Sequence, residues 1–572
     1  MKKNLLLAAV FISFVSIAQN IESKIPSSSE AVISINGDRI IELISITEFD
    51  NFNFAKKIFK KVNRKTDSTF IVSSIKDLGF DINSKAFYFY TRTDSISYHN
   101  FLVKLTDKNK FESLLSTRDK EKIISEGGLH IMADNSSITV WNDNLLLFTG
   151  YEKHYNYFKE NEERFMAEPE NEGVSYYKVK KKITSRWTKA HALNIFKGHG
   201  GTSISNSKNY IASKDKNAVA SVWVQNYSQL IFGAMSGIYN KMGVSSLDAL
   251  KSASNLYGVK SITANLYFDE EATRLTTQME VSSEWQKTFK SFYNSKMNKN
   301  FYNYFNQNDI LAYMSFSMNT QALLEEYPAL MTSMYGGIMP NYKEEVNLSG
   351  EFLSLLLDEE AIGELMTGDM LFVLNDFGEK EVTYTTYEYD ENYKSKEVTK
   401  TKKEVVPDFM IMIGSKKEAL LNKVVRLGIK HKLIANKEGY YKINVPKKDM
   451  PFDLYVVVKN DILFFTSSEE KISNIVNNRY VKNLGKHQKL IKNNSSVFYI
   501  NGEKLISKVP VSELSRKERR YFDYAKDNLK DAYFKSSKMK GNKIQSEIKI
   551  NTSNSHGNSL NVFFNLIEAL AK

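Results

Sequence analysis

The chain has 572 residues, of which 42% are hydrophobic and 12% are aromatic, and it contains no cysteine. This length predicts about two to four domains, and the hydrophobic content excludes a disordered chain. The lack of cysteine excludes disulfides, thiol nucleophiles, thiolate metal sites and a lipid-modified cysteine. The formal charge of +12 comes from 78 basic and 66 acidic residues, so the two signs are mixed and no nucleic-acid groove is indicated.

The first residues are typical of a secretory signal peptide. Lys2 and Lys3 precede an apolar run from Leu5 to Val15, which is too short to span a bilayer, and Ser16-Ile17-Ala18 is a small-residue cleavage site. We therefore expect residues 1–18 to be removed and the protein to reach the periplasm or outer envelope without a lipid anchor. No later run of about 18 apolar residues follows, so the mature chain should contain no transmembrane span.

One pattern recurs four times along the chain: a polar opener, a short strand, a breaking Asn or Gly, and an amphipathic helix. The first copy runs from Ile25 to Ile44, and the others begin at Lys216, Asn308 and Asn494. A longer series of elements also repeats from Asp309 onward. The recurrence predicts that the chain is built from repeated α+β units.

The two most specific landmarks of the longer repeat are a strand and a hairpin. Phe409–Ile413 corresponds to Phe101–Leu105, and the turn Asn460-Asp461 corresponds to Asn142-Asp143. Because the landmarks keep one order, we expect an α+β fold made of two tandem duplicated halves. These are residues 25–305 and 306–572, each with an antiparallel sheet and packed helices. Residues 160–213 are the least regular stretch of the sequence.

The second half carries an insertion that the first half lacks. Residues 380–405 alternate polar and β-prone side chains without a clean apolar face, which predicts a β-hairpin standing partly in solvent. Exposed aromatics are typical of binding surfaces, so four tyrosines of this segment are candidate partner-binding residues: Tyr384, Tyr387, Tyr389 and Tyr393. The alternative is that these tyrosines pack on the neighbouring half as a clamp.

Several of these segments together resemble one family. They are the repeated opener-strand-helix pattern, Leu365–Leu371, the Tyr-rich hairpin with Tyr389-Asp390-Glu391-Asn392, and Val405–Phe409. The chain is similar in them to the domain-of-unknown-function 4836 family of Bacteroidetes envelope proteins. The resemblance implies export and a repeated architecture, with no established activity and no catalytic residues. Members are expected to be lipoproteins in many cases, and this chain departs from them by lacking a lipobox cysteine.

No motif in the sequence indicates a reaction. None of the eight histidines lies three or four residues from another, so no helical zinc pair is present. Gly198-His199-Gly200-Gly201 matches no phosphate-binding loop, and Asp390-Glu391-Asn392 lacks the ligand series of a calcium loop. No catalytic residue, cofactor or metal ligand is therefore predicted.

Two classes of function stay open. The first is a non-catalytic exported protein that binds or scaffolds another envelope component, either a protein or a polymer. The second is an exported hydrolase whose site is assembled between the two halves. A signal peptide, a repeated architecture and the absence of catalytic motifs favour the first class.

Overall fold

The computed structural model describes residues 20–64, 70–134, 136–198, 202–225, 258–338, 342–389, 393–445, 452–509, 511 and 514–571. The expected signal peptide and the Gly-rich loop at 199–201 lie outside these residues. The chain is α+β and divides into two compact units. Unit 1 comprises Met1–Asn255, Val259–Glu270 and Gly557–Lys572, and unit 2 comprises Leu256–Gly258 and Glu271–His556. Within the described parts of both units, no helix has the length and apolar character that crossing a bilayer requires.

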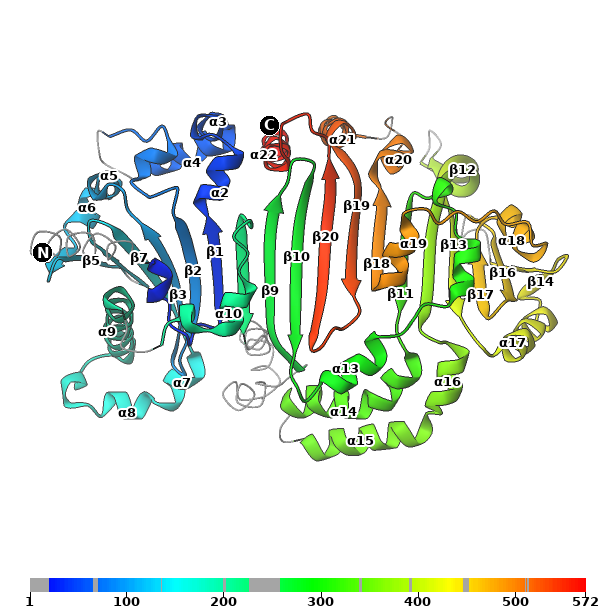
Figure 1. The fold of residues 1–572 in the computed structure, drawn as a ribbon, viewed down its shortest axis with the longest axis horizontal. Helices are drawn as coiled ribbons and strands as arrows, with labels where there is room; N and C mark the ends of the chain where they lie inside the picture. The colour runs from blue at the N-terminus through cyan, green and yellow to red at the C-terminus, as the bar shows by residue number, and fades with distance from the viewer. Residues whose placement is uncertain are drawn as a thin grey trace, which may run out of the picture. The chain divides into compact units, whose positions relative to one another are not determined.

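Unit 1 is built on an antiparallel sheet (Figure 1). Its strands are β1 (Ala31–Asn36), β2 (Lys85–Arg92), β3 (Ile96–Lys104), β4 (Ile123–Glu126), β5 (Leu129–Ala133), β6 (Ser137–Trp141), β7 (Leu145–Lys153), β8 (Ala220–Gln225) and β9 (Val259–Phe268). They pair in the order β9-β8-β1-β2-β3-β7-β6-β5-β4. The alternation along β2 places Phe87 and Phe89 in the core, while Tyr88 and Tyr90 are only half-buried.

The helices of unit 1 complete its core. They are α2 (Gly37–Leu43), α3 (Ile46–Asn51), α4 (Asn53–Asn63), α5 (Lys108–Ser113), α6 (Thr117–Lys120), α7 (Tyr155–Glu160), α8 (Glu162–Met166), α9 (Tyr176–Lys197), α10 (Lys208–Ser213) and α22 (Ser559–Ala571). Helix α9 lies against β6 and β7 (Figure 1) and contributes Ala192, Ile195 and Phe196 to the core beside Phe89.

The long helix α9 corrects the expectation that residues 160–213 are irregular. Its buried side chains recur at helical spacing: Val179, Ile183, Thr184, Thr188, Ala192, Ile195 and Phe196. Two threonines interrupt the apolar stripe, which concealed the period in the sequence. They are buried without penalty because the Thr184 hydroxyl donates to Lys180 O at 2.9 Å and the Thr188 hydroxyl donates to Thr184 O at 2.7 Å.

The strands of unit 2 are antiparallel as well. Its strands are β10 (Ala272–Val281), β11 (Ala312–Ser317), β12 (Asp369–Tyr389), β13 (Ser395–Gly414), β14 (Ile434–Asn436), β15 (Tyr441–Ile443), β16 (Leu454–Lys459), β17 (Ile462–Thr466), β18 (Asn494–Asn501), β19 (Leu529–Ser537) and β20 (Lys543–Thr552). They pair in the order β10-β20-β19-β18-β11-β12-β13-β17-β16-β15-β14.

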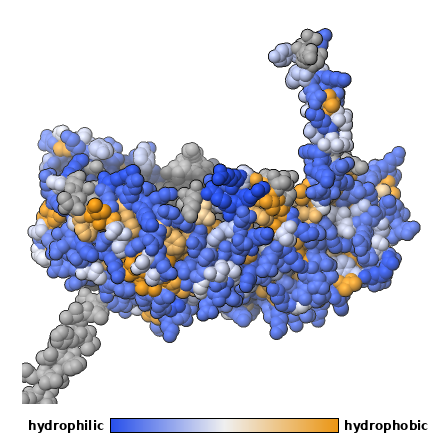
Figure 2. All heavy atoms as spheres, turned by 90° about the horizontal axis from the view of Figure 1, so that it is seen from above, coloured by the Kyte–Doolittle hydropathy of each residue, from blue (hydrophilic) through white to orange (hydrophobic). Residues whose placement is uncertain are grey.

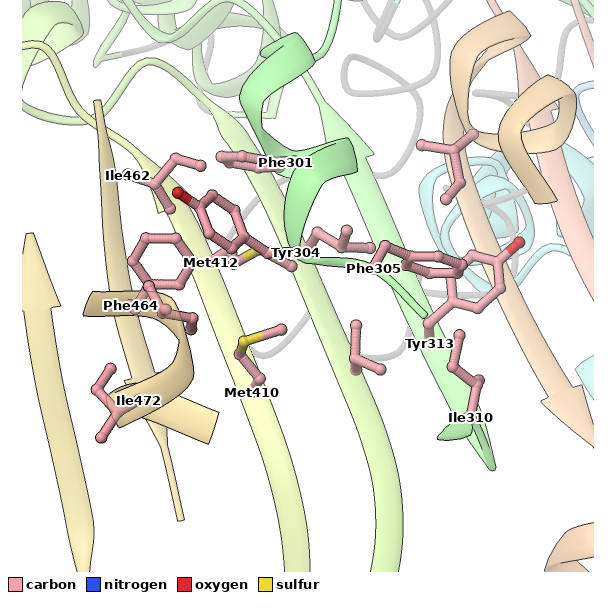
Figure 3. Packing of buried hydrophobic residues seen from close by; sticks show 14 of the residues in the cluster. Phe301, Tyr304, Phe305, Ile310, Tyr313, Met410, Met412, Ile462, Phe464 and Ile472 are labelled. Carbon is pink, nitrogen blue, oxygen red and sulfur yellow. The ribbon is translucent and has the colours of Figure 1, made fainter. Parts of the chain in front are cut away.

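The core of unit 2 is rich in aromatic side chains (Figure 3). Tyr304 meets Phe464 edge to face with ring centroids 4.8 Å apart, and Phe305 meets Tyr313 in the same way at 5.3 Å. The helices described in unit 2 are α13 (Gln286–Tyr293), α14 (Thr320–Ile338), α15 (Lys343–Leu356), α16 (Glu359–Leu365), α17 (Glu418–Lys430), α18 (Glu469–Val476), α19 (His487–Asn493), α20 (Gly502–Ser507) and α21 (Arg516–Asn528). Of these, α18 and α19 contribute side chains to this core.

The four copies of the opener-strand-helix pattern supply neighbouring strands within each unit. They contain β1, β8, β11 and β18, and they pair two by two, β1 with β8 and β11 with β18. From β9 to β4 in unit 1 and from β19 to β14 in unit 2 the strands follow the same order, and the turns at Asn142-Asp143 and Asn460-Asp461 both join the corresponding strands. A common order is what a duplication predicts. The division into compact units follows contacts and not evolutionary origin. The duplication, with its boundary between residues 305 and 306, therefore stays a prediction.

Candidate functional site: a tyrosine-bearing arm

The hairpin of β12 and β13 has a buried inner part and an exposed outer part. The two strands pair from Met370↔Ile413 to Tyr389↔Ser395, with a register shift between Leu374 and Asp376. Before the shift, the side chains of Leu371 and Val373 are fully buried in the core of unit 2. Beyond it, the pairs run without interruption from Phe377↔Pro407 outward. We call this outer part, residues 377–389 and 395–407, the arm.

The arm extends into solvent. In Figure 2 it rises beyond the body as a narrow, mainly hydrophilic projection, at the place where Figure 1 labels β12. Its described side chains are exposed or half-buried, and none belongs to a core cluster of the described residues. An isolated two-stranded ribbon is only marginally stable in water, so the arm depends on how its base is held.

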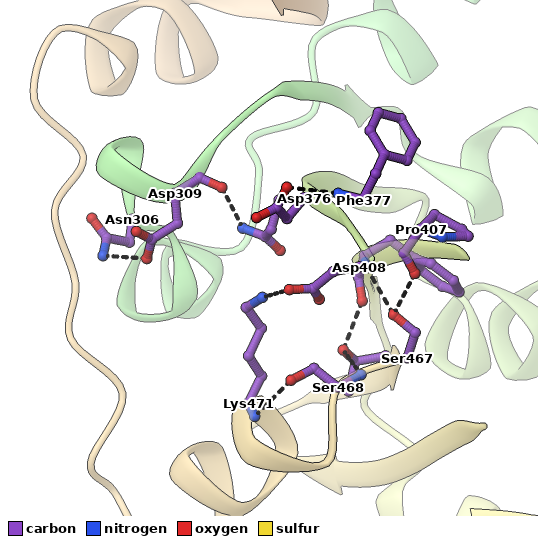
Figure 4. Close-up of polar contacts among 12 residues, drawn as sticks. Asn306, Asp309, Asp376, Phe377, Pro407, Asp408, Ser467, Ser468 and Lys471 are labelled. Carbon is purple, nitrogen blue, oxygen red and sulfur yellow. Dashed lines mark hydrogen bonds and ion pairs between the residues drawn. The ribbon is translucent and has the colours of Figure 1, made fainter. Parts of the chain in front are cut away.

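The β13 side of the base is held by β17 and α18 (Figure 4). The Ser467 hydroxyl donates to Pro407 O at 2.9 Å and accepts from the backbone N–H of Phe409 at 3.0 Å. The Lys471 ammonium donates to the Asp408 carboxylate, forming a partly buried ion pair. These contacts hold β13 at the place where it leaves the core of the sheet.

The β12 side of the base is held from the end of α20. Lys508 Nζ donates to Asp376 Oδ2 at 3.0 Å, and the backbone N–H of Phe377 donates to Asp376 Oδ1 at 2.7 Å. Burial opposes the charge on Asp376, but these hydrogen bonds outweigh it and lower the pKa of the carboxyl. The neighbouring Asn375 amide donates to Asp309 O at 3.0 Å (Figure 4). Both strands are thus tied down next to a hollow of about 700 Å³.

The four tyrosines predicted from the sequence are placed on both faces of the arm and at its end. Tyr384 is 39% exposed, Tyr387 63%, Tyr389 70% and Tyr393 87%. Because side chains alternate along a strand, Tyr387 and Tyr389 share one face and Tyr384 lies on the other. Three of the rings are therefore mostly uncovered, and the structure does not bring the four together into one cluster. The tip residues 390–392, which include the loop weighed as a calcium site, lie outside the described residues.

The faces of the arm differ in charge pairing. On the face of Tyr384, Lys400 bonds to Glu388 at 2.6 Å and Lys402 bonds to Glu404 at 2.6 Å, while the Lys402 ammonium also lies 5.5 Å from the Tyr384 ring centroid. The bond from Lys400 lowers the pKa of Glu388. The face of Tyr387 and Tyr389 has its ion pair near the base, between Lys403 and Glu379 at 3.2 Å. Its outer part offers uncovered aromatic rings, which is the arrangement that suits a protein or polymer partner.

Sequence reasoning missed the residues that hold the arm. Asp376, Asp408, Lys471 and Lys508 come from four different segments, so no local spacing joins them. The one available signal was the polar pair Asn375-Asp376, which ends the apolar run Met370–Leu374 at the register shift. Among the described residues, no group of three or more His, Asp or Glu side chains could hold a metal ion.

Comparisons with known proteins add little. No protein-family model matches the sequence, and no curated protein matches it. Among solved structures, the chain is similar to crystal form I of TP0453, with 9% identity over 46% of this chain and 80% of that chain and a TM-score of 0.23. Crystal form III of TP0453 gives 9% identity over 49% and 82%, with a TM-score of 0.21. Scores this low carry no information about the role of the chain.

Proposed function

We propose that this chain is an exported, non-catalytic envelope protein that binds another envelope component through the arm. The observation that carries the proposal is the exposure of Tyr387 and Tyr389 on one face of a ribbon whose base is held by ion pairs and hydrogen bonds. Aromatic rings left in water are costly unless a partner covers them, and tyrosine is enriched where proteins meet partners. Export is supported by the charged start and short apolar run of residues 1–18.

The ribbon form of the arm suits this role. Each ring is held at a fixed interval by the paired backbone, so little conformational freedom is lost when a partner covers it. The tyrosine hydroxyls and the neighbouring threonines, Thr383 and Thr385, add polar groups on the same face. The partner is therefore expected to present a surface with both apolar and hydrogen-bonding groups.

Site-specific photo-crosslinking tests the proposal. A photoreactive phenylalanine analogue at position 387 or 389 should give crosslinked products with envelope extract that the same analogue at 155 or 177 does not give. Tyr155 and Tyr177 are matched controls, because each is 70% exposed but lies outside the arm. The variant Tyr387→Ser, probed with the analogue at position 389 on the same face, should give less of those products. Identical products from arm and control positions would contradict binding through the arm. N-terminal sequencing that finds an intact Met1 on cytoplasmic protein would contradict export.

A further inference from the structure

A second hollow of unit 2, of about 1030 Å³, is strongly basic. It is bordered by α19, by β18 and β19, and by the segment that precedes the 3-10 helix Lys299–Tyr304. Its lining residues include none of the arm, and Asp531 is the single carboxylate among those the structure describes. We call it the lysine hollow after the residues that predominate in its wall.

Two of the lining lysines are neutralised by carboxylates. Lys486 Nζ lies 3.1 Å from Asp531 Oδ2, and Lys535 Nζ lies 2.9 Å from Glu547 Oε1. The remaining lysines form no ion pair within the described part of the chain: Lys296, Lys299, Lys489, Lys492, Lys538 and Lys540. The hollow therefore has a large uncompensated positive charge, which a concave surface concentrates.

The lysines are close enough to repel one another. Burial lowers the pKa of Lys538, and the positive charge of Lys296 lowers it further, while Asp369 acts in the opposite direction. Like charges brought together on a folded surface destabilise it unless an anion binds between them. Lys296 and Lys538 thus lie close enough for their positive charges to repel each other.

The floor of the hollow is already satisfied by its own contacts. The Asp531 carboxylate accepts hydrogen bonds from the Asn551 amide at 2.6 Å and from the Tyr499 hydroxyl at 3.2 Å. His487 is 4% exposed and shares a hydrogen bond of 3.2 Å with the Tyr313 hydroxyl. A ligand would consequently be held by the lysines of the wall and by the nearby amides of Gln488 and Asn493.

We propose that the lysine hollow binds an acidic oligosaccharide. Its volume exceeds what one small inorganic anion fills, so the ligand should carry several separated charges. The cations are lysines, which act as point charges and require no fixed geometry of the anion, as suits charges spread along a flexible polymer. The side-chain amides of the lining can bond to sugar hydroxyls.

The test measures binding of an oligogalacturonate, a chain of uronic-acid sugars, to the full mature chain by calorimetry. A quadruple variant should bind at least ten-fold more weakly when Gln replaces Lys489, Lys492, Lys538 and Lys540 in the same chain. A control variant with the same change in charge replaces Lys423, Lys430, Lys437 and Lys526, which are exposed elsewhere in unit 2; it should stay within two-fold of wild type. Thermal unfolding of both variants shows that they are folded.

Three results would overturn the proposal. The first is that oligogalacturonate does not bind the wild-type chain, or binds it no more tightly than an uncharged galactose oligomer. The second is that both quadruple variants weaken binding equally, which would indicate general surface charge. The third is that tripolyphosphate binds more tightly than oligogalacturonate through the same four lysines, which would assign the hollow to a phosphorylated ligand instead.

Discussion

Gly37 and Gly502 occupy the same position in two copies of the repeated pattern, directly after the Asn that ends β1 or β18. In both places the backbone of another segment passes so closely that a side chain has no room. A Cβ on Gly37 would lie 2.0 Å from Ile82 O, and a Cβ on Gly502 would lie 2.0 Å from Lys530 O. The shared Asn-Gly sequence therefore has a steric cause in each unit.

Substituting either glycine with alanine should destabilise the chain strongly, because the neighbouring atom belongs to the backbone and not to a movable side chain. We expect Gly37→Ala and Gly502→Ala each to lower the free energy of unfolding by about 3 kcal/mol, as measured by urea denaturation. Gly150→Ala is the control, since its Cβ would lie at an ordinary 3.7 Å from the Phe148 ring. Equal, small effects at all three positions would contradict the close approach.

The two ion pairs at the base of the arm should differ in their contribution to stability. Side-chain exposure is 18% for Lys471 and 31% for Asp408, but 43% for Lys508 and 45% for Asp376. Lys471→Met should therefore cost about 2 kcal/mol, because it leaves a partly buried carboxylate unpaired, and Lys508→Met should cost less than about 1 kcal/mol. Denaturant unfolding of the two variants checks this order, and a larger loss for Lys508→Met would contradict it.

The buried His487 should make the stability of unit 2 dependent on pH. Burial, with a smaller effect of Lys486, lowers the pKa of His487 to about 4. Between pH 6.5 and 4 the unfolded chain binds a proton that the folded chain does not, so stability should fall as the pH falls through this range. The loss approaches about 3 kcal/mol at pH 4.

The variant His487→Gln isolates this effect. It retains a group that can bond to the Tyr313 hydroxyl, but it cannot titrate. The difference in unfolding free energy between wild type and variant should be constant from pH 7 to 8 and should shift in favour of the variant by pH 4.5. Parallel pH profiles over the whole range would show that His487 titrates normally in the folded chain.

Removing the arm should leave the rest of unit 2 intact. The side chains that the structure describes in the arm belong to no core cluster. The core residues of β12 and β13 lie in the inner part of the hairpin, on the other side of the register shift from the arm. We expect replacement of residues 380–405 by a two-residue turn to change the melting temperature by less than about 2 °C. A fall of several degrees in calorimetry would mean that the arm is structural, as the clamp alternative requires.

Much of the fold could be predicted from the sequence, because strands and helices follow the local spacing of apolar side chains. Strands such as β1, β11 and β18 alternate clearly, and the turn at Asn460-Asp461 has positive φ at both residues, as two-residue hairpin turns require. The helix α9 was missed because its buried stripe includes hydrogen-bonded threonines. The spacing of apolar side chains does not reveal a helix whose buried face includes polar side chains that donate hydrogen bonds to the backbone of the same helix.

The sites were less predictable because their residues converge from distant segments. The tyrosines of the arm could be named since they lie together in one insertion. The lysine hollow could not, because its wall draws on residues from Lys296 to Lys540 that only the sheet order brings together. In a chain with 78 basic residues, no spacing marks those six lysines as a group.

The uninterrupted pairing of the arm makes it a spacer whose length can change in fixed steps. From Phe377↔Pro407 to Tyr389↔Ser395 the ribbon reaches roughly 40 Å at the rise of an antiparallel strand. Deleting or adding two residues in each strand would move the tip by about 7 Å while keeping every side chain on its own face. A single-residue change in each strand would instead exchange the faces of Tyr384 and Tyr387. Homologous arms should therefore differ in length by even numbers of residues per strand.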